Sequence, residues 1–162
     1  MIRKIAKLLF VIPFLFVSTT VLAQDIEKQV LTISGGTATG DTAQLSIQDL
    51  EKLPQVEYVT ATPWHDGQVS FKGVLLSVLM DHLGATGDSA EIVALNDYRA
   101  VLPVSDFEEH APILAYKLND KYMRVRDKGP LFVIYPFDDK PELKTEVHYS
   151  RSVWQVRSIV VE

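Results

Sequence analysis

The stretch RDKGPLFVIYPF, residues 126–137, joins a polar turn to a run of large apolar side chains. Gly129 and Pro130 are residues typical of turns. The run that follows is rich in β-branched and aromatic residues, which favour a strand, and it is apolar at consecutive positions. It therefore predicts a strand that is buried on both faces.

The segments on either side of this stretch also predict strands. ILAYKL at 113–118 and KYMRV at 121–125 are separated by Asn119 and Asp120, a pair typical of hairpin turns. VWQVRSIVVE at 153–162 alternates apolar and polar residues and predicts a closing strand. The second half of the chain is thus predicted to be mostly strand.

The first half of the chain predicts further short strands. A second hairpin is expected at 91–104, with Asn96 and Asp97 as its turn pair. VLTIS at 30–34 alternates apolar and polar residues and is expected to be an edge strand. Two more strands, VEYVTAT and VSF, are expected at 56–62 and 69–71.

Three short helices are predicted between the strands. Apolar residues at helical spacing extend over 73–85, with Gly84 where a left-handed C-terminal residue belongs. A helix at 45–54 is expected to use Ser46 as its N-cap. A capping-box pattern at 105–108 predicts the third helix. The mixture is neither a regular βαβ alternation nor a pure sandwich, so we expect an α+β fold with a mixed β-sheet and a few short helices.

The first 23 residues have the pattern of a cleavable secretion signal. Three cations precede an apolar run at 8–17, and small residues lead to Ala23. The run is about half as long as the roughly 20 apolar residues that span a bilayer, and it contains Pro13. We therefore expect a periplasmic or secreted protein whose single mature domain, residues 24–162, has no stable membrane insertion.

The composition excludes several kinds of chemistry. The chain has no cysteine, so it has no disulfide, no thiol nucleophile and no thiolate metal ligand. Three of the 16 Lys and Arg lie in the predicted signal, which leaves 13 against 21 Asp and Glu. Such an acidic chain is not expected to bind nucleic acid or an anionic membrane.

Six segments, taken in order, resemble the oxidoreductase molybdopterin-binding domain family, which has the sulfite oxidase fold, and especially its small exported members. The segments are TPWHDG at 62–67, FKGVLLSVLM at 71–80, LNDY at 95–98, ILAYKLND at 113–120, RDKGPLFVIYPF at 126–137 and YSRSVWQV at 149–156. They extend over nearly all of residues 24–162. The resemblance implies one domain of that fold, with a cleft formed by the connecting loops.

The sequence departs from the enzymes of this family at both cofactor-holding places. In those enzymes a cysteine near the end of an early strand ligates molybdenum, whereas the matching segment here, VTATPW at 59–64, contains no sulfur. Their Asp-His-Gly segment continues to a proline and an arginine; here Lys128 replaces the histidine and Phe132 the arginine. Cofactor-loaded proteins cross membranes folded, usually with a twin-arginine signal, and Arg3-Lys4 is not one. We therefore expect no cofactor, with molybdopterin as the alternative.

The loops that match the enzymes' cofactor cleft bring polar and aromatic residues together in the implied fold. The ligand-binding candidates are Trp64, His65, Asn96, Asp97, Tyr98, Arg126, Lys128, Tyr149 and Arg151, together with Trp154. Arg126 or Arg151 would hold a carboxylate or oxyanion through two guanidinium nitrogens. Indole and phenol rings would exclude water from the contact.

Each candidate also has a structural explanation that the sequence leaves open. Trp154 fits a core position on the last strand, and the arginines fit surface ion pairs. Asn96 and Asp97 need no role beyond their turn. The four histidines lack the spacing of metal ligands, so no metal site is expected.

The sequence favours an exported, non-catalytic domain that binds a small anionic ligand and reports it to a membrane signalling protein. Two alternatives stay open. One is a molybdopterin-dependent oxidoreductase whose metal is held without a protein thiolate, and the other is a protein-interaction module that pairs through an exposed strand edge. A serine hydrolase is disfavoured because the chain has no G-x-S-x-G segment.

Overall fold

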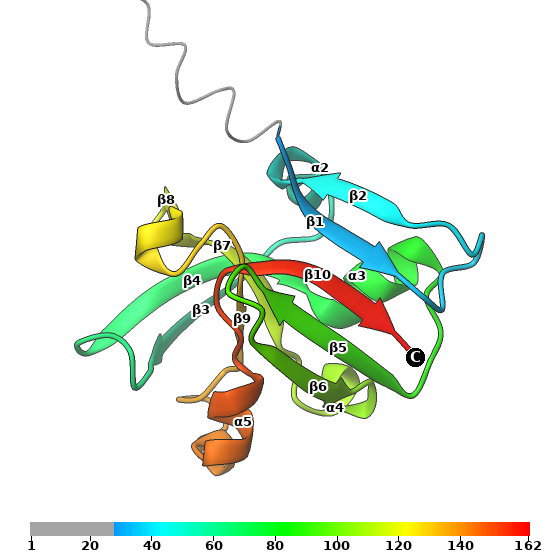
Figure 1. The fold of residues 1–162 in the computed structure, drawn as a ribbon. Coiled ribbons are helices and arrows are strands. Elements are labelled where there is room, and N and C mark those ends of the chain that lie inside the picture. The colour runs from blue at the N-terminus through cyan, green and yellow to red at the C-terminus, as the bar shows by residue number, and fades with distance from the viewer. Residues whose placement is uncertain (1–27) are drawn as a thin grey trace, which may run out of the picture.

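The computed structural model describes residues 28–162, which form two β-sheets with short helices around them (Figure 1). The predicted signal peptide lies outside the described residues. None of the helices within residues 28–162 is long and apolar enough to cross a membrane. The α+β class predicted from the sequence is confirmed, because sheets and short helices alternate irregularly along the chain.

The first sheet has the strand order β2-β1-β10-β5-β6. Its strands are β1 (Gln29–Ser34), β2 (Ala43–Ser46), β5 (Ser89–Ala94), β6 (Arg99–Pro103) and β10 (Val156–Val161). The first and last strands pair in parallel, with Thr32 opposite Ser158, and the other pairs are antiparallel. The prediction that 30–34 is an edge strand is wrong, because β2 pairs with its other side and takes the edge.

The second sheet has the order β3-β4-β7-β8, and β9 also pairs with β7. Its strands are β3 (Val56–Ala61), β4 (Gln68–Leu75), β7 (Ile113–Leu118), β8 (Lys121–Tyr122) and β9 (Phe132–Ile134). The strand predicted at 121–125 ends at Tyr122, because the carbonyl of Arg124 accepts from the amides of Asp127 and Gly129 and turns the chain. A β-bridge from Phe132 to Trp154 links this sheet to the segment that enters β10.

The helices are short, as predicted, but their positions differ in part. They are α2 (Ile47–Glu51), α3 (Leu76–Leu83), α4 (Ser105–Glu109), α5 (Glu146–Arg151) and the 3₁₀ turns η1 (Val125–Asp127) and η2 (Pro141–Leu143). The start of α3 at Leu76 rather than Gly73 is set by β7, which pairs with β4 through Leu75. A Cβ at Gly73 would lie 2.1 Å from the carbonyl oxygen of Leu114, so the pairing requires glycine there.

The predicted helix ends are confirmed at two places and wrong at a third. Gly84 ends α3 with a φ of 58°. Ser46 caps α2, and it forms a capping box with Asp49, whose backbone N–H donates to the serine hydroxyl. The capping box predicted at 105–108 does not form, because Val104 is the N-cap residue of α4 and provides no side-chain oxygen.

Two clusters of buried side chains form the core. The larger cluster packs the first sheet against α2, α3 and the inner residues of β7 and β9. The smaller cluster contains Phe71, Met123 and Phe132 from the second sheet and its connections. Trp64 is half-buried and packs against both clusters, so the loop after β3 lies where they meet. That loop carries the first of the predicted site residues.

Candidate functional site

A pocket of about 300 Å³ opens where three loops meet beside α5. It is lined by Trp64, Asn96, Tyr98, Tyr149, Ser150, Ser152, Val153 and Trp154. Trp64 follows β3, Asn96 and Tyr98 belong to the turn between β5 and β6, and the other residues extend from α5 toward β10. The structure thus brings together four of the nine predicted ligand candidates, and Trp154 with them.

Aromatic rings form one wall of this pocket. The Trp64 ring centroid lies 5.6 Å from that of Trp154 and 5.9 Å from that of Tyr149, both in edge-to-face geometry. Phe132 lies behind them, 5.5 Å from Trp64 and 6.1 Å from Trp154. Such a wall offers a flat apolar group a contact from which water is excluded. Trp154 is half-buried: its ring packs against the smaller core cluster and also lines the pocket. Its structural explanation and its binding explanation therefore both apply.

The pocket is also lined by the β5–β6 turn and by α5, which are joined by a hydrogen bond. The Tyr98 hydroxyl donates to the backbone carbonyl of Ser150, with 2.9 Å between the oxygens. The Tyr98 amide donates to Oδ1 of Asn96 at 3.1 Å. The β5–β6 turn is therefore fixed to α5, and the exposed Asn96 amide group stays at the pocket with donor capacity for a ligand.

Lys128 does not line the pocket itself, but its side chain lies over the ring of Trp154, which does. Its Nζ is 5.0 Å from the centre of the Trp154 ring, within cation–π range. His65 lies nearby, with Nδ1 2.9 Å from the Thr62 hydroxyl. Burial, and then the charge of Lys128, lower the pKa of His65 from its usual value, which favours the neutral imidazole. The lasting positive charge at this site is that of Lys128.

The other charged candidates make ion pairs outside the pocket lining. Arg151 contacts Asp106 at 2.8 Å, and Asp97 contacts Arg157 at 2.5 Å. The Arg126 side chain is 71% exposed and lies 3.9 Å from Asp127. The surface explanation that the sequence left open thus fits Arg126, whereas Arg151 is paired with a carboxylate that is buried. Their proposed role in holding an anion stays a prediction.

The segment that matches the enzymes' cysteine-bearing strand is tied to the loop at 138. Thr60 is buried, and its Oγ1 accepts from the backbone N–H of Asp138 at 3.0 Å. In return, Oδ2 of Asp138 accepts from the backbone N–H of Ala61 at 2.8 Å. These reciprocal bonds hold the end of β3 in place beside Trp64. The Thr60 hydroxyl thus stabilises the end of β3, and Thr60 does not line the pocket.

Asp138 is expected to make stability depend on pH in the acid range. Its hydrogen bonds from Lys144, then from Gln68 and from the Ala61 N–H, hold its pKa at about 2, below the ordinary 3.8. A carboxylate with a lowered pKa in the folded state stabilises above its unfolded pKa, and this stabilisation is lost as the pH falls through the folded pKa. Asp138→Asn should therefore unfold at lower urea concentration at pH 7. The difference from wild type should shrink between pH 4 and pH 2, and a difference that stays constant over this range would contradict the assignment.

The profile of the oxidoreductase molybdopterin binding domain family matches residues 18–137, which is well over half of the chain. The chain belongs to this family. Its fold is similar to that of the sulfane dehydrogenase SoxCD from Paracoccus pantotrophus, with a TM-score of 0.63 and 17% sequence identity. The similarity covers 84% of this chain but only 38% of the SoxCD chain. A search among curated proteins found no match.

The residues at this family's cleft do not fit a molybdenum cofactor held by the protein. Molybdenum is ligated in the resembling enzymes by a thiolate, and this chain has none to offer. The pocket supplies indole, phenol, amide and hydroxyl groups and no thiolate. No group of three potential His, Asp or Glu ligands occurs within residues 28–162. Phe132, which the resemblance matches to the enzymes' phosphate-binding arginine, is fully buried.

Sequence reasoning missed the helix that carries part of the pocket. The residues from Tyr149 to Ser152 were expected in a loop, but Tyr149 to Arg151 belong to α5. Thr145 caps this helix through Oγ1, which accepts from the N–H of His148, and Glu146 stands in the first turn. Threonine followed by an acidic residue is a helix-start signal, so this part could have been found. The contribution of Val153 to the pocket had no such signal.

Proposed function

We propose that this family member is an exported, non-catalytic binding domain, whose ligand is a small molecule with a flat apolar body and an anionic group. The observation that carries the proposal is the aromatic pocket itself, which joins Trp64, Tyr149 and Trp154 beside the Lys128 ammonium. The aromatic rings would hold the flat body. The ammonium would attract the anionic group.

We propose that the domain is non-catalytic because of the side-chain groups that the pocket offers. No described residue of the pocket is a thiolate, and the Thr60 hydroxyl that lies near the place of the enzymes' cysteine already accepts a hydrogen bond. His65, a candidate base in the loop that carries Trp64, is hydrogen-bonded to Thr62 rather than to a carboxylate. The pocket thus provides recognition groups, and we assign no reaction step to it.

A membrane signalling protein is the partner that we propose for the ligand-bound state. The pocket is bounded by α5 and by the β5–β6 turn, which are linked through the Tyr98 hydroxyl and Ser150. A ligand between them would change the exposed surface that both elements present. A partner that contacts this surface would therefore distinguish the free domain from the occupied one.

The proposal is tested by thermal unfolding of residues 24–162 with small aromatic carboxylates, such as benzoate and indole-3-carboxylate, and with their neutral amides. We expect a carboxylate to raise the midpoint temperature more than its amide does. Lys128→Gln should remove this preference. Lys140→Gln, which changes a lysine that donates to the Glu109 carbonyl instead, should keep it. If no compound stabilises the wild type, or if Lys128→Gln keeps the preference, the proposal is wrong.

Family membership favours one alternative function, a molybdopterin-dependent oxidoreductase. This function would require that the cofactor's own sulfurs hold the metal without help from a protein thiolate. Molybdenum and pterin content should be measured in protein isolated from its native compartment. We expect both near background. Stoichiometric molybdenum would establish the alternative and overturn the non-catalytic proposal.

A further inference from the structure

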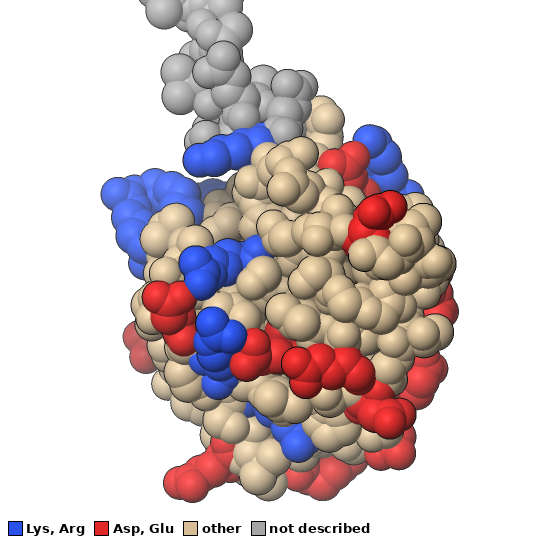
Figure 2. All heavy atoms as spheres, turned by 45° about the vertical axis from the view of Figure 1, so that its right-hand side comes forward, with Lys and Arg blue, Asp and Glu red and all other residues tan. Residues whose placement is uncertain are grey.

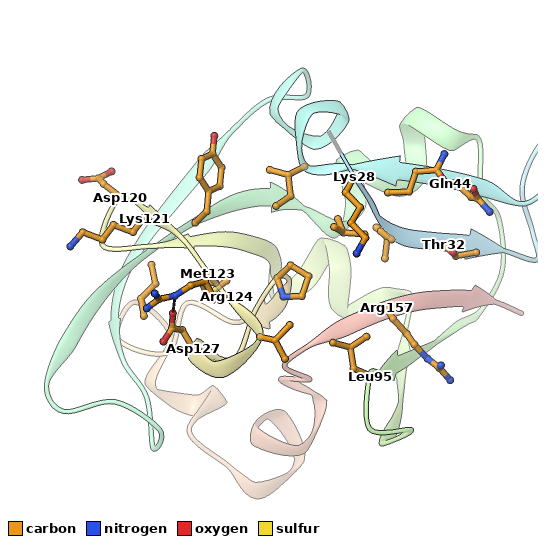
Figure 3. Close-up of a pocket in the computed structure, with 18 of the residues that line it drawn as sticks. Lys28, Thr32, Gln44, Leu95, Asp120, Lys121, Met123, Arg124, Asp127 and Arg157 are labelled. Atoms are coloured by element: carbon orange, nitrogen blue, oxygen red, sulfur yellow. Dashed lines mark hydrogen bonds and ion pairs between the residues drawn. The ribbon is translucent and has the colours of Figure 1, made fainter. Parts of the chain in front are cut away.

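A second, larger hollow, which shares no lining residue with the aromatic pocket, lies between the two sheets (Figure 3). We call it the intersheet groove. Its volume is about 1340 Å³, and it is lined by residues of β1, β8 and the segment through η1, with Leu95 and Arg157 on the far side. Pockets for small molecules usually measure about 300–1,000 Å³. The size of the groove therefore fits a polypeptide segment better than a metabolite.

Apolar side chains remain exposed along this groove. Val125 is 53% exposed, Leu95 45% and Tyr122 39%. All three line the groove, and its deeper wall contains the buried residues Leu31 and Met123. Contiguous exposed apolar side chains with polar neighbours are typical of protein interaction sites.

The groove is also basic, although the protein is acidic. Its lining includes Lys28, Lys121, Arg124 and Arg157 but only two acidic residues, Asp120 and Asp127. Arg124 and Arg157 are ion-paired, whereas no ion pair of Lys28 or Lys121 occurs in the described structure.

The charges of the protein are also segregated on its surface. Figure 2 shows one face on which most Lys and Arg side chains lie on the left and most Asp and Glu along the lower and right sides. Lys28 and Lys121, which have no ion pair within residues 28–162, lie beside the apolar surface of the groove. They would attract a negatively charged partner.

The edge of the second sheet lies at this groove. β8 is the last strand in the order β3-β4-β7-β8, and both of its residues, Lys121 and Tyr122, line the groove. An edge strand has backbone groups that can pair with an added strand. An extended segment is therefore favoured over a helix as the occupant, because it can use this edge.

We propose that the intersheet groove binds an extended acidic segment of a partner protein. Backbone groups of the segment would pair along β8, its apolar side chains would contact Val125 and Leu95, and its carboxylates would approach Lys28 and Lys121. This interaction needs neither Lys128 nor the aromatic pocket. It therefore stands or fails independently of the ligand proposed above.

The proposal is tested with residues 24–162, which contain both sheets, by fluorescence anisotropy of a labelled peptide of about eight residues that alternates glutamate and leucine. Replacing Lys28 and Lys121 by glutamate should weaken binding about tenfold or more at low salt, and the difference should shrink at high salt. Lys140→Glu, a single charge reversal outside the groove, should leave the affinity unchanged. A lysine–leucine peptide should not bind.

Four outcomes would overturn the proposal. The first is equal binding by the doubly reversed variant, and the second is equal binding of the basic peptide. The third is tighter binding to vesicles that contain phosphatidylglycerol than to the acidic peptide, which would assign the groove to a lipid surface. The fourth is binding that appears only when the chain starts at Lys28, because residues 24–27 would then be the segment that occupies the groove.

Discussion

Replacing Phe132 with alanine is expected to lower the free energy of unfolding by about 3–5 kcal/mol, the range observed when a large buried aromatic side chain is removed. Phe132 has no exposed surface and lies on β9, the strand predicted from the stretch at 126–137. Its ring contacts Phe71, Trp64 and Trp154 at centroid distances of 5.9, 5.5 and 6.1 Å. The resulting cavity would lie directly behind the aromatic pocket.

The same variant tests how strongly the pocket depends on the core. With Phe132 removed, Trp64 and Trp154 lose the ring against which both pack, so carboxylate binding should fall together with stability. Urea unfolding followed by tryptophan fluorescence measures the loss of stability. Val59→Ala, on the exposed face of β3 at 56% exposure, is the control and should change stability by less than about 0.5 kcal/mol. A Phe132→Ala loss as small as that of Val59→Ala would show that Phe132 is not a packing centre.

The position of Phe132 also bears on the departure from the enzymes that the family resemblance implies. The resemblance places an arginine of the enzymes at this position, where it would grip a phosphate. In this chain a phenylalanine at the same place has become part of the core. The fold has thus been kept with a core contact where the enzymes have a ligand contact, which is consistent with the family match across residues 18–137.

Local signals predicted most of the fold, and they failed where tertiary pairing decides. Gly84 and Ser46 were placed correctly because a left-handed C-terminal residue and an N-cap depend on nearby atoms. The boundary at Leu75 was missed because the apolar run from 73 to 80 has no break, and only pairing with β7 divides it into strand and helix. The inner position of β1 was missed for the same reason, since only the folded chain shows that β2 pairs with its free side.

The candidate site also has a part that could be predicted from sequence and a part that depends on the folded chain. Trp64, Asn96, Tyr98 and Tyr149 were predicted from the loops of the family and do line one pocket. The partners of Arg151 and Asp97 could not be predicted, because each of these partners lies far away in the sequence. Arg151 meets Asp106 across 45 positions, and Arg157 meets Asp97 across 60. A charged side chain can be recognised as a candidate from sequence, but whether its charge is already matched depends on the folded chain.

Arg151→Met is expected to lower the free energy of unfolding by about 3 kcal/mol, because it leaves the Asp106 carboxylate buried without its cation. Asp106 is 5% exposed, and its Oδ2 accepts from Arg151 at 2.8 Å and from the Tyr135 hydroxyl at 3.0 Å. Arg126→Met is the matched control, because that side chain is largely exposed, and it should change stability little. The measurement is urea unfolding at pH 7.

A double variant separates the structural role of Arg151 from a role in binding. Asp106→Leu combined with Arg151→Met removes both charges, so it should recover much of the lost stability. Recovery should be incomplete, because the buried Tyr135 hydroxyl also loses its acceptor. If Arg151 holds the ligand, this folded double variant should lose carboxylate binding. If Lys128 supplies the charge and Arg151 only anchors α5, it should bind as the wild type does, and this second result is the one we expect.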